Sequence, residues 1–159
     1  MYKKVMLTLI GVIILGVAYY AVSPVFRTVH SNDVAPQMAH DSSGASSSQD
    51  ITEAKSASAR VLPTAAHPAS GSVRVITTKD GTVVRYEDYK TLNGPDLYVY
   101  LSNDLEAKDF VNLGTLKATE GNINYPVPVG VDVKKYRYVL TWCKTFGVLF
   151  NSADISSIQ

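Results

Sequence analysis

A single cysteine, Cys143, lies between Trp142 and Lys144 in the segment "YVLTWCKTFGVLF", residues 138–150. A cysteine thiol takes part in redox chemistry when it is accessible and when a neighbouring positive charge favours its thiolate form. An unpaired cysteine in an apolar segment can equally fill a core as a small hydrophobic residue. Cys143 is therefore the candidate redox thiol, with Trp142 and Lys144 shaping its surroundings, and the choice between a buried and a reactive thiol stays open.

Other residues that carry redox or hydrolytic chemistry are missing around this cysteine, because residues 70–159 contain no histidine and no methionine. A blue-copper site requires two histidines and a cysteine. An iron–sulfur cluster normally requires four cysteines, and covalent haem attachment requires a C-x-x-C-H motif. Nucleophiles activated by histidine are excluded as well. The sequence predicts no cofactor and no hydrolase or metalloenzyme activity; haem ligated by Cys143 alone is the one cofactor alternative.

The three histidines and the densest acidic segment do not indicate a metal site. His30, His40 and His67 are well separated in a polar part of the chain, without the spacing of metal ligands. Residues 104–109 contain three acidic side chains, but not in the order that a calcium-binding loop requires. We expect these side chains to be exposed to solvent.

The N-terminal part of the chain predicts a membrane anchor. After two lysines in residues 1–4, residues 5–22 form an uncharged apolar run that would span roughly 27 Å as a helix, close to the thickness of a hydrocarbon core. Lysines before such a run place the N-terminus in the cytoplasm. We expect a transmembrane signal-anchor over residues 5–26, a single-pass protein at the cell membrane and an extracytoplasmic C-terminal domain. A cleaved signal peptide is the alternative.

Composition divides the rest of the chain into a linker and a domain. Residues 27–69 are rich in Ser and Ala and too polar to form a core, which predicts a disordered tether. Residues 70–159 carry ten basic and ten acidic side chains, and the whole chain has a net charge of +1. This balance gives no electrostatic case for a nucleic-acid partner.

The domain over residues 70–159 shows the pattern of an antiparallel β-sandwich. Short apolar and β-branched runs alternate with Gly, Asn, Asp and Pro, and Asp80-Gly81 between two such runs is a strong hairpin signal. In "DLYVYLS", leucines and a valine alternate with tyrosines, so one face of this strand is aliphatic and the other aromatic. About seven strands are expected, which suits an all-β sandwich.

Several motifs in the domain, in this order along the chain, are similar to those of a known family. They are "GPDLYVYLS" (94–102), "LGTLK" (113–117), "GNINY" (121–125), and the segment from Tyr136 through "WCK" to Phe146. Over residues 70 to about 155 the chain resembles the electron-transfer DM-thirteen domain family. The resemblance implies a redox or electron-transfer role, proposed for the family around the cysteine that aligns with Cys143.

Two hypotheses about function follow. The first is a membrane-anchored extracytoplasmic module with a redox or electron-transfer role centred on Cys143, with a redox or surface protein as its partner. The second is a non-enzymatic binding or adhesion module whose tether presents a polar sandwich to a partner, and the absence of cofactor ligands favours it. Seven of the ten tyrosines fall in the domain, and a tyrosine-rich face would suit the binding of protein or carbohydrate. Aromatic residues also stabilise sheets through cross-strand pairs, so the tyrosines alone do not separate the two hypotheses.

Overall fold

The computed structural model describes residues 2–22, 27–36 and 57–159. Within these residues it has one α-helix, one short 3₁₀ helix and ten strands. The helices are α1 (Tyr2–Val22) and η2 (Val133–Lys135), and the strands are β1 (His30–Asn32), β2 (Ala59–Arg60), β3 (Leu62–Pro63), β4 (Ala69–Thr78), β5 (Gly81–Thr91), β6 (Leu97–Ser102), β7 (Phe110–Thr115), β8 (Glu120–Pro126), β9 (Tyr138–Cys143) and β10 (Val148–Asp154).

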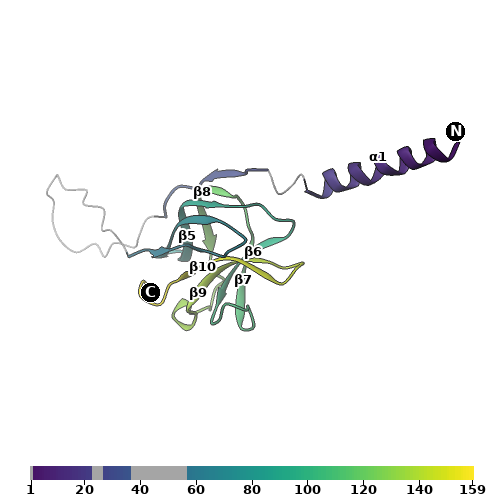
Figure 1. Ribbon diagram of the computed structural model, residues 1–159. Coiled ribbons are helices and arrows are strands. Elements are labelled where there is room, and N and C mark those ends of the chain that lie inside the picture. The colour runs from purple at the N-terminus through teal and green to yellow at the C-terminus, as the bar shows by residue number, and fades with distance from the viewer. Residues whose placement is uncertain (1, 23–26, 37–56) are drawn as a thin grey trace, which may run out of the picture.

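The strands form two five-stranded sheets that pack face to face (Figure 1). The first has the order β1-β8-β5-β4-β2, and the second has the order β3-β10-β9-β6-β7. Neighbouring strands are antiparallel except for β1, which runs parallel to β8. The chain passes from the first sheet to the second between β2 and β3, where Val61 is buried. The predicted all-β sandwich is therefore confirmed.

The seven strands from β4 to β10 are those that the alternating pattern predicts. The turn between β4 and β5 forms at the predicted place, with Gly81 at a φ of +134° and the Thr78 hydroxyl donating to the Gly81 carbonyl at 2.9 Å. Strands β1, β2 and β3 come from the segment that we predicted to be linker. Residues 37–56 of that segment lie outside the described residues.

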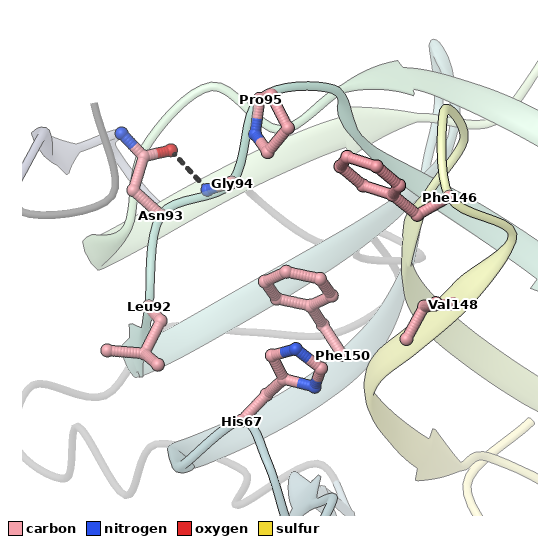
Figure 2. Close-up of a pocket in the computed structure, with 8 residues that line it drawn as sticks. All are labelled: His67, Leu92, Asn93, Gly94, Pro95, Phe146, Val148 and Phe150. Atoms are coloured by element: carbon pink, nitrogen blue, oxygen red, sulfur yellow. Dashed lines mark hydrogen bonds between the residues drawn. The ribbon is translucent and has the colours of Figure 1, made fainter. Parts of the chain in front are cut away.

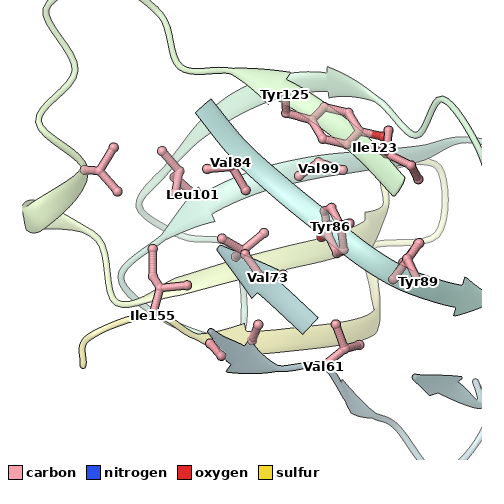
Figure 3. Packing of buried hydrophobic residues seen from close by; sticks show 14 of the residues in the cluster. Val61, Val73, Val84, Tyr86, Tyr89, Val99, Leu101, Ile123, Tyr125 and Ile155 are labelled. Atoms are coloured by element: carbon pink, nitrogen blue, oxygen red, sulfur yellow. The ribbon is translucent and has the colours of Figure 1, made fainter. Parts of the chain in front are cut away.

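Both sheets contribute side chains to one main core between them (Figure 3). Its largest fully buried residues include Tyr86, Tyr89 and Tyr125 from the first sheet and Leu101 and Val139 from the second. Two of these tyrosines, Tyr86 and Tyr89, reach across the core to one hydroxyl of the second sheet. Burial raises the pKa of Tyr86 and of Tyr89, so both phenols stay neutral and available for hydrogen bonding.

The predicted membrane anchor is wrong. Residues 2–22 are helical, but among the described residues no helix combines the length and the apolar content that a bilayer crossing requires. The prediction rested on the apolar run of residues 5–22 and on the two lysines before it. The same finding corrects three related predictions: the transmembrane signal-anchor over residues 5–26, the membrane as a partner and the single-pass localisation. Residues 23–26 lie outside the described part.

Residues 29–34, here called the edge segment, bind along the free edge of β8. The Val29 carbonyl accepts the N–H groups of residues 119 and 120 at 2.8 and 3.0 Å, and the Asp33 N–H donates to the Asn122 carbonyl at 2.9 Å. Ser31 lies directly over Gly121, where a Cβ atom would overlap the Ser31 carbonyl oxygen. The edge segment therefore requires glycine at position 121.

Replacing Gly121 by alanine is expected to release the edge segment. Gly121 has a φ of +108°. Gly114 in β7 has a similar φ of +118° but no atom within 4 Å of the position that a Cβ would take, so Gly114→Ala is a matched control for backbone strain. Each substitution should cost about 1–3 kcal/mol in strain. Only Gly121→Ala should also make residues 27–36 sensitive to limited proteolysis, and equal protection in both variants would contradict the close approach.

Candidate functional site

Cys143 is buried at the end of β9, with 1% of its surface exposed. It pairs with Leu97 of β6 on one side and with Val148 of β10 on the other. Its neighbours in a small second core are Leu97 and Phe150, with Leu116 packed against them. The thiol therefore lies in an apolar cluster, out of reach of water.

The orientation of β9 is fixed by its middle residue. Thr141 points into the main core, where its hydroxyl oxygen lies 3.2 Å from the Tyr86 hydroxyl and 2.9 Å from the Tyr89 hydroxyl. Since side chains alternate along a strand, Val139 and Cys143 point inward with it. A polar residue therefore lies on the inward face, which explains why the alternation of apolar residues could not settle the orientation of Cys143.

Trp142 and Lys144 lie on the other side of the second sheet from the thiol. Trp142 is half-buried and pairs with Tyr98 of β6 across the outer face. The Lys144 ammonium lies 5.3 Å from the centre of the Tyr98 ring, and the Lys144 N–H donates to the Asp96 carbonyl at 2.9 Å. The three candidate residues are thus adjacent in the chain but do not converge on one point.

The outer face of the second sheet carries a row of aromatic side chains. We call Trp142, Tyr98, Tyr100 and Phe110 the outer aromatic row. The Tyr98 and Tyr100 ring centres are 6.1 Å apart, and Tyr100 stacks on Phe110 at 4.2 Å. Burial, with the neighbouring Tyr98 as a smaller cause, raises the pKa of Tyr100. The row runs from the chain neighbour of Cys143 to the partly exposed Phe110.

A cavity of about 410 Å³ is lined by side chains of the last hairpin, of the loop after β5 and of His67 (Figure 2). Phe150, which contacts Cys143 in the small second core, also lines this cavity. Gly94 allows the loop after β5 to pass close by, because a Cβ there would lie 3.0 Å from both Leu97 and Phe150. The buried thiol and the cavity therefore share one aromatic side chain as a wall.

His67 is the residue of this cavity that the sequence did not indicate. Its ring stacks on Phe150 with centres 3.8 Å apart and an interplanar angle of 17°, and its Nδ1 lies 2.9 Å from the Thr64 hydroxyl. We expected a solvated linker histidine, and the structure instead places it half-buried against the second sheet. In the sequence, His67 is an isolated histidine shortly before the first long strand, and nothing else around it indicates a site.

The acidic loop uses its carboxylates internally. The Asp104 carboxylate accepts the N–H groups of Glu106, Lys108 and Asp109, and Asp109 accepts from the Asn103 side chain at 2.6 Å. Across the described ranges, no three His, Cys, Asp or Glu side chains are grouped so that they could hold a metal ion. The loop is thus organised by its own hydrogen bonds.

These features define a β-sandwich domain with a buried thiol beside an apolar cavity. The family model of the electron transfer DM13 domain matches residues 61–155, and the chain belongs to this family. The match begins at the crossing between the two sheets and ends just after β10, so it includes Cys143 and most of both sheets. No curated protein and no solved structure shows significant similarity to the chain.

Substitution of Cys143 should distinguish burial from accessibility. Cys143→Ser places a hydroxyl without an assured partner in an apolar cluster and should cost about 1–3 kcal/mol of unfolding free energy. Cys143→Ala only removes packing and should cost no more than the serine variant. Denaturant melts of both variants and the parent measure the difference, and rapid maleimide labelling of the native parent would contradict the buried thiol.

Proposed function

We propose that the domain is an electron-transfer accessory module in which Cys143 is the redox-responsive group, Trp142 exchanges electrons with it and Lys144 places a positive charge over the neighbouring Tyr98 ring. Membership of the electron transfer DM13 family supports a redox-related role. The observation that supports assigning this role to Cys143 and Trp142 is the register of β9 and β6. It pairs Trp142 with Tyr98, directly beside the pair of Cys143 with Leu97. Neighbouring residues thus connect the thiol to the outer aromatic row.

The burial of Cys143 favours the transfer of single electrons over disulfide exchange. Thiol–disulfide exchange requires one sulfur to attack another directly, and 1% exposure leaves no room for a second sulfur. A single electron can move between neighbouring side chains without contact with solvent. In such a relay, each side chain that loses an electron regains one from its neighbour, so the domain ends in the state in which it began.

Lys144 gives this relay a direction. Its positive charge over the Tyr98 ring stabilises the electron-rich neutral ring and disfavours removal of an electron from it. Lys144 therefore makes Tyr98 a poorer electron donor to an oxidised Trp142, and Cys143 is the neighbouring donor that we propose in its place. The partner of the module is then an electron donor or acceptor protein that contacts the outer aromatic row.

Pulse radiolysis tests the role of Cys143, because Trp142 is the only tryptophan of the chain. Azidyl radicals remove one electron from Trp142, and its indole N–H loses a proton. We expect one electron and one proton in total to pass from the Cys143 S–H group to the neutral indole radical, which restores the indole N–H and leaves a thiyl radical on Cys143. In Cys143→Ala the absorbance of the Trp142 radical should therefore decay several-fold more slowly than in the parent.

The control for this measurement is Tyr98→Phe, which removes the competing donor beside Trp142. It should leave the lifetime of the radical close to that of the parent, because Lys144 disfavours oxidation of Tyr98. Equal lifetimes in Cys143→Ala and the parent would refute the assignment of Cys143 as the redox-responsive group.

A non-enzymatic binding module is the second candidate function. The partial exposure of Phe110, 42%, at the end of the outer aromatic row favours it, because exposed aromatic side chains on a sheet face are typical of contact surfaces. If the Trp142 radical decays at the same rate with and without Cys143, binding of a partner would explain the outer aromatic row better than electron transfer does.

A further inference from the structure

The cavity shown in Figure 2 has the size and composition of a small-molecule site. Its volume of about 410 Å³ lies within the usual range of ligand pockets. Phe146, Phe150, Leu92, Pro95 and Val148 line it, and none of its lining residues is acidic, lysine or arginine. Burial of apolar surface, rather than attraction between charges, must therefore drive any binding there, which favours an uncharged ligand.

Several apolar side chains at this cavity are left exposed to solvent. Phe146 is 68% exposed, and Val148 and Leu92 are 39% and 38% exposed. A ligand that covers any of these side chains removes apolar surface from water, which lowers the free energy of the complex. Because these side chains surround a concave site rather than being scattered over the surface, they indicate a binding position.

The wall of the cavity that carries Phe146 is held in place. The Thr145 hydroxyl, next to Phe146, donates to the Asp96 carboxylate at 2.8 Å, and the Lys144 N–H donates to the Asp96 carbonyl. These two hydrogen bonds join the β9–β10 turn to the loop before β6. The turn that carries Phe146 is therefore tied to the loop before β6 before a ligand binds, which lowers the ordering cost of binding.

The shape and polarity of the cavity select a planar ligand with one polar edge. Phe150 and His67 present nearly parallel rings, and Figure 2 shows Phe146 and Pro95 on the side of Phe150 away from His67. Flat aromatic groups stack on such surfaces at favourable distances. His67 bonds to Thr64 through Nδ1, and none of the described residues supplies a hydrogen bond to its other ring nitrogen.

We propose that this cavity binds an uncharged planar aromatic molecule that stacks on its phenylalanine rings and forms one hydrogen bond to His67. This site is separate from the proposed electron relay, because it requires neither the thiol of Cys143 nor the outer aromatic row. It adds a ligand of defined chemistry to a domain whose family description names only electron transfer.

Equilibrium dialysis of the full chain with three probes tests the site. The probes are 2-naphthol, which is planar with one hydroxyl group, naphthalene, which lacks the hydroxyl, and cyclohexanol, which has the hydroxyl but is not planar. We expect saturable binding of 2-naphthol, roughly fivefold to tenfold weaker binding of naphthalene because one hydrogen bond is lost, and no measurable binding of cyclohexanol.

Three variants assign the binding to this cavity. His67→Phe keeps a stacked ring and should lower the affinity for 2-naphthol to that for naphthalene. The affinity for naphthalene itself should not change. Phe146→Ala should weaken the binding of both aromatic probes. Because the Phe146 side chain is exposed, its removal should not unfold the protein. Phe110→Ala, an exposed phenylalanine outside the cavity, is the matched control and should change neither affinity.

Three results would overturn the proposal. The first is the absence of saturable binding of 2-naphthol, and the second is binding that His67→Phe and Phe146→Ala leave unchanged. The third is tighter binding of N-acetylphenylalanine amide than of 2-naphthol, which would show that the cavity receives an aromatic side chain of a protein.

Discussion

Two hydrogen bonds between the sheets determine most of what the second sheet presents on its two faces. The hydroxyl groups of Tyr86 and Tyr89 cross the core to the Thr141 hydroxyl, and Tyr89 also contacts the Asn151 side chain of β10. Buried polar groups have to be paired, and a shift of β9 by one residue would leave these phenols unpaired. The inward thiol and the outward indole both follow from this pairing.

The parts of the fold that follow from local pattern are predictable from the sequence, and we predicted them. Alternation with period two marks β4 to β10, and the Asp80-Gly81 turn marks the first hairpin. The orientation of β9 is different, because Leu140 on its outer face is as fully buried as Thr141 on its inner face. Apolar alternation therefore carries no information there, and only the long-range contact with the tyrosines decides it.

The cavity could not be predicted, because it is assembled from three distant segments. His67 precedes β4, residues 92–95 follow β5, and Phe146 and Phe150 come from the last hairpin. The composition around His67 is typical of a linker, and strands of two residues such as β2 and β3 are too short to show alternation. The membrane prediction was wrong on another point, since it rested on one segment of the sequence and no helix in the described part of the chain meets the requirements of a bilayer crossing.

The edge segment shows that the folded unit extends beyond the part that the family model matches. The match begins at Val61, whereas β1 and β2, which form the two outer strands of the first sheet, precede it. A fragment cut at that boundary would leave the N–H and carbonyl groups along β8 and β4 without partners. Unpaired strand edges are templates for pairing with other chains, so residues 29–34 and 59–60 protect this domain from edge-to-edge aggregation.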